Sequence, residues 1–439
     1  MNTDTMPRID VVLDHATLLT MDDGRPGPLA GPMQGRVDRI DDGAIAVAGG
    51  RIAAVGPRDG VWRHVDAARA GRAELGGGAM DVVDAAGRVV LPGLVDAHTH
   101  LVWAGTRADE FEARLTGTSY LDLLANGGGI NATVRATRAA SFDDLVARMT
   151  ARLDVLVDHG VTTVEVKTGY GLTVDEEMRH LDVIAAAASA HPARVVPTFL
   201  GAHALPSAYA GAHAPDRGAF VREVIGMLPR VAAHPLGRRG PLFCDVFCDA
   251  GAFDVAETRA VLTAAKAAGL GLKVHSDEFE NLGATALAAE LGATSADHLV
   301  ATTPAEMAAL ARSGTVAVLL PVTTIGLGST HFADGAAFVR HGAPVALASD
   351  WNPGTAPCPN LWLALAIGTR YGRLSVAEAL VAVTRNAACA VGRDAVAGRL
   401  AVGRPADAVL TDSDDPRELA YGFGTNRAVR VMLAGRWVR

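Results

Sequence analysis

Two histidines separated by one residue, His98 and His100, follow an apolar run and are the first residues with an evident capacity for chemistry. The stretch reads RVVLPGLVDAHTHL and covers residues 88–101. Residues two apart on an extended chain point the same way, so the two imidazoles would converge. Neutral imidazole nitrogens suit a divalent metal, which binds them at about 2.0–2.1 Å. An isolated His-x-His also fits two solvent-facing loop histidines, so a metal site requires further ligands from elsewhere in the chain.

The segment that follows alternates short apolar runs with alanine-rich runs of helical pattern. The eight candidate strands are 89–95, 161–167, 194–200, 242–248, 271–275, 294–299, 315–320 and 344–349. The helical segments between them include 173–190, 254–268, 281–291 and 304–312, and each closes near a glycine or proline. An eightfold βα alternation predicts a (β/α)₈ barrel, which we place at residues 89–390. A doubly wound open sheet is the alternative arrangement of the same elements.

Both ends of the chain have a different pattern. Short β-like runs split by glycine and aspartate occur at 10–13, 44–56 and 80–84, and none of them resembles a long amphipathic helix. The pattern returns after residue 397, in GRLAVGRPADAVL and AVRVMLAGRWVR. We therefore expect residues 1–88 and 391–439 to form one small β-sandwich domain from both termini.

A barrel makes a specific prediction, because active sites on this fold lie at the C-terminal ends of the strands. The residues at or just past those ends are His98, His100, Lys167, Tyr170, His203, Asp249, His275, Glu278, His298, Thr323 and Asp350. Five of the fourteen histidines fall in this group. Such clustering favours a metal site over scattered surface or core histidines.

Composition limits the classes of function. With 49% hydrophobic and 20% charged residues among 439, and no apolar run approaching the roughly 18 residues of a membrane span, the sequence is typical of a soluble globular protein without a membrane partner. The beginning, MNTDTMPRIDVV, has no signal-peptide pattern, so a cytoplasmic location is expected. A net charge of −8 argues against a nucleic-acid surface, and an anionic substrate would need a local cation. The four cysteines form no Cys-x-x-Cys pair and are expected to be reduced thiols in or near the core.

The combined pattern resembles the amidohydrolase superfamily, and six segments together resemble its imidazolonepropionase family. They are TRADEFEARLTGTSYLDLLANGGGINATVRATR (106–138), EVKTGYGL (165–172), TFLGAHALP (198–206), KVHSDEF (273–279), SADHL (295–299) and LASDWNPGT (347–355). Enzymes of this family open the imidazolone ring in histidine degradation. The resemblance covers the barrel and both flanks, whereas His-x-His alone would not separate many kinds of hydrolase.

The resemblance implies roles for individual residues. The metal ligands would be His98, His100, His275 and Asp350. The catalytic residues would be Glu278 for proton transfer, His298 beside the carbonyl, and Asp350. The substrate contacts would be Arg107, Tyr170, His203, Asn352, Gly354 and Thr355. The family also suggests a homodimer acting on a small anionic substrate.

The number of metal ions depends on the fourth strand. Binuclear relatives place a carboxylated lysine there, but residues 242–249 read LFCDVFCD and contain none. We therefore expect one divalent metal per subunit, Zn²⁺ or Fe, because three histidines and an aspartate suit either ion. Lys167, at the end of the second strand, is expected to be a structural or electrostatic residue.

The implied reaction adds water to the ring carbonyl of 4-imidazolone-5-propanoate and cleaves the cyclic C–N bond to give N-formimidoyl-L-glutamate. A divalent ion lowers the pKa of bound water from about 16 to about 7. Asp350 would accept or orient the proton of the water, Glu278 would protonate the departing nitrogen, and His298 would donate a hydrogen bond to the oxyanion. Glu280 is the neighbouring alternative to Glu278.

Several assignments keep an alternative. Arg107 would bind the propanoate in bidentate fashion or form a surface ion pair with Asp109 or Glu110. Tyr170 would contact the ligand or pack in its turn. The turn at 352–355 could present backbone N–H groups to the ligand. The glycines at 127–129 form either a mobile loop over the barrel mouth or a plain connector.

Two other functions fit the same sequence. The first is an aromatic aminoheterocycle deaminase, which would use similar ligands but release ammonia. The second is a metal-binding barrel that acts as a binding or assembly module without catalysis, against which the complete ligand set and Glu278 argue.

Overall fold

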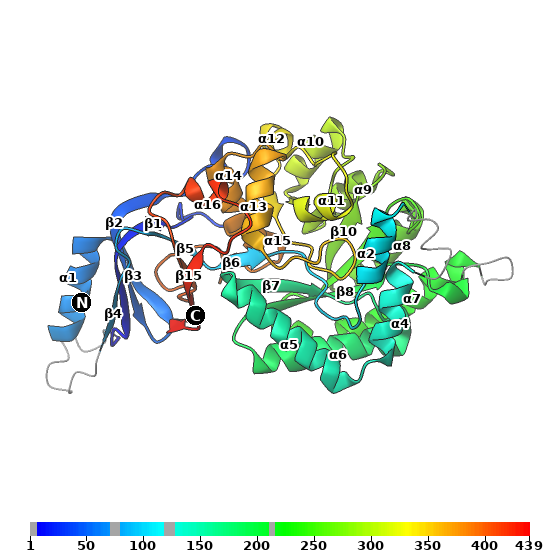
Figure 1. Cartoon of the computed structure of the whole chain (residues 1–439), viewed down its shortest axis with the longest axis horizontal. Helices are drawn as coiled ribbons and strands as arrows, with labels where there is room; N and C mark the ends of the chain where they lie inside the picture. The colour runs from blue at the N-terminus through cyan, green and yellow to red at the C-terminus, as the bar shows by residue number, and fades with distance from the viewer. Residues whose placement is uncertain (1–6, 71–79, 118–127, 210–215) are drawn as a thin grey trace.

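Two sheets organise the chain, as Figure 1 shows for the computed structural model, which describes residues 7–70, 80–117, 128–209 and 216–439. One sheet of eight parallel strands has the spatial order β13-β12-β11-β10-β9-β8-β7-β6, which is the order of the strands in the chain. The other is a mixed sheet built from both ends of the chain. Within the ranges described, every helix is too short or too polar to cross a membrane.

The parallel sheet confirms the prediction of a (β/α)₈ barrel. Its strands are β6 (Leu94–Asp96), β7 (Val161–Lys167), β8 (Arg194–Ala202), β9 (Phe243–Cys248), β10 (Gly271–Ser276), β11 (Ser295–His298), β12 (Val316–Leu319) and β13 (Val345–Leu347). The residues of β7 are all buried, as expected for a strand covered on both faces.

Helices lie between consecutive strands and pack around the barrel. They are α2 (Ala108–Leu115), α4 (Ile130–Ala139), α5 (Phe142–Asp158), α6 (Val174–Ala190), α7 (Arg217–Ala232), α8 (Val255–Ala267), α9 (Ala284–Leu291), α10 (Pro304–Ser313), α11 (Pro321–Gly326) and α12 (Gly335–Arg340), with α13 (Leu361–Arg370), α14 (Val376–Ala382) and α15 (Arg385–Ala390) after β13. Local signals set their ends. Helix α8, for example, begins with a capping box in which Asp254 and Glu257 each accept a backbone N–H of the other.

The barrel closes between β13 and β6 through the residues that follow both strands, which we call the closing seam (residues 98–100 and 349–351). The N–H of Asp350 donates to the carbonyl of His98 at 3.0 Å, and the N–H of His100 donates to the carbonyl of Trp351 at 3.0 Å. Below them, the N–H of Ser349 donates to Asp96 Oδ1 at 3.0 Å. Residues predicted to bind a metal thus also join the first barrel strand to the last.

The mixed sheet confirms that both termini build one β unit. Its strands are β1 (Val11–Leu19), β2 (Arg39–Ala48), β3 (Arg51–Pro57), β4 (Asp81–Asp84), β5 (Val89–Pro92), β14 (Ala408–Thr411), β15 (Ala428–Leu433) and β16 (Arg436–Trp437). In Figure 1 the blue and red ends of the chain lie together beside the barrel. β5 lies between β1 and β14 and so connects the two halves.

The prediction of one strand over 89–95 was wrong. β5 belongs to the mixed sheet and β6 to the barrel, and the chain changes sheet at Gly93. A β-carbon at Gly93 would lie 2.2 Å from Thr162 Oγ1, so only glycine fits this crossing. Both strands are fully buried, and the apolar run from Val89 to Val95 did not separate them.

The N-terminal segment also contains a helix that the pattern analysis missed. Helix α1 (Arg58–Ala70) buries Val61, Val65 and Ala68 against one face of the mixed sheet, where Val12 and Ala46 are buried with them. These positions recur at helical spacing, so the signal was present in VWRHVDAA.

Candidate metal centre and active site

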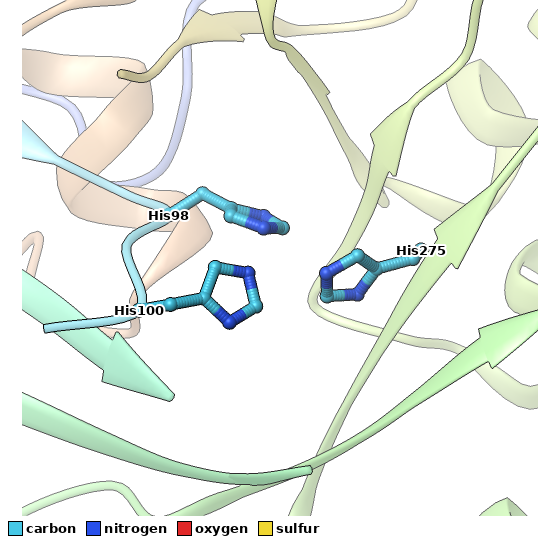
Figure 2. A group of neighbouring side chains, drawn as sticks. All are labelled: His98, His100 and His275. Atoms are coloured by element: carbon cyan, nitrogen blue, oxygen red, sulfur yellow. The ribbon is translucent and has the colours of Figure 1, made fainter. Parts of the chain in front are cut away.

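Three histidines from two barrel strands face one another at the C-terminal end of the barrel (Figure 2). His98 and His100 follow β6, and His275 lies in β10. The ring centroid of His98 is 4.5 Å from that of His275 and 5.3 Å from that of His100. All three rings are buried, and one nitrogen of each lies within 4.8 Å of a nitrogen of the other two.

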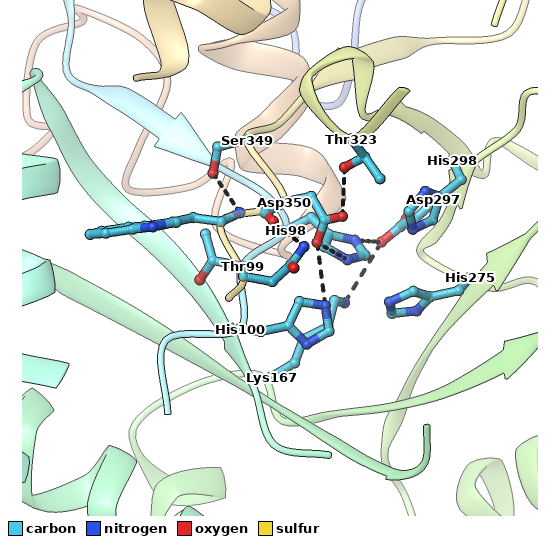
Figure 3. A network of polar contacts seen from close by, with 12 residues as sticks. His98, Thr99, His100, Lys167, His275, Asp297, His298, Thr323, Ser349 and Asp350 are labelled. Carbon is cyan, nitrogen blue, oxygen red and sulfur yellow. Dashed lines mark hydrogen bonds and ion pairs between the residues drawn. The ribbon is translucent and has the colours of Figure 1, made fainter. Parts of the chain in front are cut away.

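Asp350 and His298 complete the cluster from the other side (Figure 3). Together with His98 they form a second group of three ligand atoms within 4.8 Å of one another. Asp350 Oδ1 lies 3.5 Å from His98 Nε2 and 3.4 Å from His100 Nε2. The hydroxyl of Thr323 donates to Asp350 Oδ2 at 2.6 Å and fixes the carboxylate.

The chemistry of these atoms fits a divalent metal ion. In the part of the chain that the structure describes, four buried atoms of the cluster have no hydrogen-bond partner: His98 Nε2, His275 Nε2, His298 Nε2 and Asp350 Oδ1. Leaving one buried polar group unpaired costs about 1–3 kcal/mol, so a cluster of them marks a missing partner. Imidazole nitrogens with one carboxylate are a typical donor set for zinc and other transition metals.

The ionisation of the cluster also suits a cation. Burial lowers the pKa of His98 and of His100, so both imidazoles are neutral and keep a lone pair. Burial alone would raise the pKa of Asp350, but its contacts with His100, His298 and Thr323 together hold that pKa below the usual range. The cluster thus offers neutral nitrogens and an ionised carboxylate.

Two carboxylates that the sequence analysis missed orient the histidines. Asp297 Oδ2 lies 2.7 Å from His98 Nδ1, and Asp245 Oδ2 lies 3.0 Å from His275 Nδ1. A carboxylate partner on one ring nitrogen fixes the tautomer and leaves the other nitrogen for a metal. The available signal was a charged residue inside an otherwise buried strand, in FCDVFC and SADH.

Glu278 follows β10 and faces His298. Its Oε2 lies 3.7 Å from His298 Nδ1, and its side chain is only 8% exposed. Burial, with the nearby charges of Asp350 and Asp249, raises the pKa of Glu278 well above its ordinary value. The raised pKa favours the protonated form of this carboxyl group, which is the form that can act as an acid. Glu280, the alternative, is exposed.

A cavity of about 210 Å³ opens beside the cluster. Its lining contains most of the residues predicted from the sequence, namely His100, Arg107, Tyr170, His203, His275, Glu278, His298, Asp350, Asn352 and Thr355. Gly354 lies next to the lining, because a β-carbon on it would meet Arg107 Nη1 at 2.2 Å. The predicted ligand, catalytic and substrate residues thus converge on one cavity.

Arg107 forms the ion pair that was its alternative role, and its side chain also lines the cavity. Its Nε lies 3.0 Å from Glu110 Oε2, so the local ion pair forms, and its side chain is 16% exposed. Glu110 also accepts the N–H of Gly129 at 3.0 Å through Oε1. The ion pair with Glu110 therefore holds the guanidinium group of Arg107 at the cavity wall. Gly127, the first glycine of the run considered as a lid, lies outside the described residues.

Aromatic rings form another part of the wall. The rings of His203 and His100 stack at a centroid distance of 5.0 Å, and the ring of Tyr170 lies 5.4 Å from that of His203. His203 Nδ1 is 3.0 Å from the carbonyl of Gly169, which fixes its orientation. Tyr170 thus both packs and lines the cavity.

The turn after β13 differs from the prediction that it would present backbone N–H groups to a ligand. The N–H groups of Gly354 and Thr355 both donate to Asn352 Oδ1 at 2.8 Å. Asn352 Nδ2 in turn donates to the carbonyl of Asp350 at 2.8 Å. That prediction was wrong, because the side chain of Asn352 takes up these groups and the side chains of Asn352 and Thr355 line the cavity instead.

The amidohydrolase family profile matches residues 81–119 and 109–438. An imidazolonepropionase of Herpetosiphon aurantiacus is 46% identical over 99% of this chain and 98% of its own. One of Chloroflexus aggregans is 45% identical over 99% of both chains.

Solved structures agree on the fold. An adenosine deaminase from Xanthomonas campestris with bound zinc has a TM-score of 0.67 at 18% identity, and covers 98% of this chain and 93% of its own. The guanine deaminase of E. coli has a TM-score of 0.65 at 17% identity over 98% of both chains. At such identities the likeness concerns the fold alone. The sequence relatives decide the family: the chain belongs to the imidazolonepropionase family of amidohydrolases.

Proposed function

We propose that the chain hydrolyses the cyclic amide C–N bond of 4-imidazolone-5-propanoate to N-formimidoyl-L-glutamate, in the degradation of histidine. One observation carries the proposal: metal-ligand atoms without a hydrogen-bond partner in the described chain, Glu278 with its raised pKa and the cation Arg107 all lie around one cavity. Family membership supports the choice of substrate. A single divalent ion, Zn²⁺ or Fe, held by His98, His100, His275 and Asp350 would supply an activated water.

Different side chains of the protein then carry out the individual proton transfers. Asp350, which is ionised, accepts a proton from the water while the water oxygen adds to the ring carbonyl carbon. Glu278 delivers its proton to the ring nitrogen as the C–N bond breaks. Burial lowers the pKa of His298 to about 3, so its ring is neutral and can donate one N–H to the carbonyl oxygen.

The anionic end of the substrate needs a cation, and Arg107 is well placed to provide it. A guanidinium pairs with a carboxylate in bidentate fashion, and the pair is stronger than a neutral hydrogen bond. Tyr170 and His203 offer flat surfaces for the ring, and Asn352 and Thr355 offer polar groups beside it. The cavity therefore combines a site for a ring with a site for its propanoate.

An assay with two readouts tests the proposal. The purified protein is incubated with imidazolonepropanoate and with aminoheterocycles while ring absorbance and ammonia are followed separately. We expect ring opening without ammonia, its loss on treatment with a chelator, and its return with Zn²⁺ or Fe²⁺. His275→Ala should lose both metal and turnover. Ammonia release without ring opening would replace the proposal with a deaminase.

We further propose that the protein forms a homodimer and acts on a small anionic molecule, with neither nucleic acid nor membrane as partner. The dimer follows from the family resemblance. Light scattering of the purified protein over a range of concentrations tests it. A monomeric mass at every concentration would contradict it.

A further inference from the structure

A network of buried charges fills the barrel interior beneath the metal cluster. Lys167 Nζ lies 2.7 Å from Glu165 Oε1 and 2.7 Å from Asp245 Oδ2. Lys273 Nζ lies 3.5 Å from the same oxygen of Glu165. All four side chains are fully buried. Charges at such depth are stable only when they are paired.

The network reaches the histidines through Lys167. The oxygen of Asp245 that contacts Lys167 is also the oxygen that contacts His275 Nδ1, at 3.0 Å. On the other side, Lys167 Nζ lies 3.7 Å from Asp297 Oδ2, which contacts His98 Nδ1 at 2.7 Å. Figure 3 shows the contact between Lys167 and Asp297 at the side of the cluster. One ammonium group therefore lies between the two oxygens that orient two of the histidines.

This placement has a physical reason. Two carboxylates that approach the same ammonium also approach each other, and their repulsion is strong where water is excluded. A cation between them offsets that repulsion and fixes both positions. Without the cation, the carboxylates would move apart or take other partners, and the imidazoles that they hold would turn with them.

We propose that Lys167 is a positioning residue of the metal centre: it holds Asp245 and Asp297 where they set the ring orientations of His275 and His98. The inference rests on the proposed metal centre. It explains a buried lysine that the reaction itself does not use.

Lys273 provides a matched control within the same network. It is as deeply buried as Lys167, and Nζ lies 3.3 Å from the carbonyl of Ala97 and 3.2 Å from Ser295 Oγ. Its carboxylate partner is Glu165, whose side chain, in the part of the chain that is described, contacts Lys167, Thr198 and Lys273 and no histidine. Lys273 acts on Asp297 only through space, since no ion pair joins Lys273 to Asp245 or Asp297 in the described chain. Loss of Lys273 therefore removes an equally buried charge but no direct contact with the two carboxylates that lie against the histidines.

The test compares Lys167→Met with Lys273→Met in the full chain. Zn²⁺ affinity is measured by competition with a chromophoric chelator, and the d–d absorption bands of the Co²⁺ form report the ligand geometry. Loss of a residue that orients a metal ligand costs about 10–100-fold in metal affinity. We expect a loss of that size and shifted Co²⁺ bands for Lys167→Met, and a clearly smaller loss and smaller band shifts for Lys273→Met, even where both lower the unfolding temperature.

The outcomes separate the inference from the proposed function. If the parent protein binds one Zn²⁺ but the two variants bind it equally well, the role of Lys167 is overturned and the metal centre stands. If the parent binds neither Zn²⁺ nor Co²⁺, the proposed metal centre falls and the inference with it.

A second pair of variants tests the inference if Lys167→Met alone does not fold. Adding Asp297→Asn to each lysine variant removes one charge of each sign and lessens the charge imbalance. In this background Lys167→Met still removes the partner of Asp245, so its Zn²⁺ affinity should be lower than that of the Lys273→Met pair. Equal affinities in this pair would overturn the inference.

Discussion

Asp249 directly follows β9, and its carboxylate accepts hydrogen bonds from the backbone at Glu278, which follows the neighbouring strand β10. Asp249 Oδ2 accepts the N–H of Glu278 at 2.7 Å and that of Phe279 at 3.0 Å, and Oδ1 accepts the N–H of Glu280 at 3.0 Å. The carboxyl group proposed as the acid is thus fixed relative to the next strand. The main chain of Glu278 is therefore held in place, and only its side chain can move toward a substrate.

Replacing Glu278 with glutamine should separate proton transfer from metal binding. The amide keeps the shape but has no acidic proton to deliver, so we expect turnover to fall by roughly 10²–10⁴-fold, the usual contribution of a general acid. Metal content, measured by elemental analysis, should be unchanged. Glu280→Gln is the matched control, because Glu280 is exposed, and should keep parental turnover. Full activity in Glu278→Gln would remove Glu278 from the mechanism.

The pH profile of turnover tests the same residue independently. Burial raises the pKa of Glu278, so the acid form persists to higher pH than in an exposed glutamate. Turnover of the parent should therefore decline on the alkaline side as Glu278 loses its proton. Glu278→Gln cannot lose one, so its residual turnover should lack that decline. An alkaline decline that is identical in both proteins would assign it to another group.

Arg107→Ala should weaken binding of the propanoate. Hydrogen bonds to charged groups contribute about 1.5–3 kcal/mol, which corresponds to roughly 10–100-fold in affinity. Competitive inhibition constants of a carboxylated imidazole and of its amide give the measurement: the carboxylate should lose affinity in the variant and the amide should not. Arg135→Ala, at an exposed position of α4, serves as the control. Equal losses of affinity for both inhibitors would mean that Arg107 does not distinguish the carboxylate from the amide.

Gly354→Ala should disturb Arg107 without touching the metal ligands. A β-carbon at this position would lie 2.2 Å from Arg107 Nη1, so the guanidinium must move. We expect a higher KM with a smaller change in kcat, and unchanged metal content. Gly226→Ala in α7 is the control, because its β-carbon would meet nothing within 4 Å. Unchanged KM in Gly354→Ala would show that the guanidinium need not occupy this position.

His180 makes the stability of the protein depend on pH. It is buried in α6 without a partner for either ring nitrogen in the described chain, and burial lowers its pKa to about 3. The unfolded chain binds a proton near pH 6.5 and the folded chain does not, so this group's contribution is present above that pH and falls by about 1.4 kcal/mol per unit below it. Denaturant unfolding at pH 7.5 and pH 5 measures the difference. His180→Leu should lose about 2 kcal/mol less than the parent over this interval, and an equal loss would contradict the assignment.

The barrel could be predicted because its strands are buried runs with clear helix signals between them. The bounds expected for 161–167 match β7, and the rule that active sites lie at strand ends brought His98, His275 and Asp350 to one place. The break at Gly93 was not predicted, because a strand buried in the mixed sheet has the same hydrophobic pattern as a strand buried in the barrel. Knowledge of strand ends could not supply the pairing of His98 with Asp297, which depends on the three-dimensional relation of distant strands.

The closing seam has a consequence for biosynthesis. His98 and Asp350 follow the first and last strands of the barrel, and the N–H of Asp350 donates to the carbonyl of His98. A chain still emerging from the ribosome holds His98 and His100 long before it contains Asp350. An ion that needed all four proposed ligands would therefore bind only after the last barrel strand had docked, so that its uptake would report on closure of the barrel.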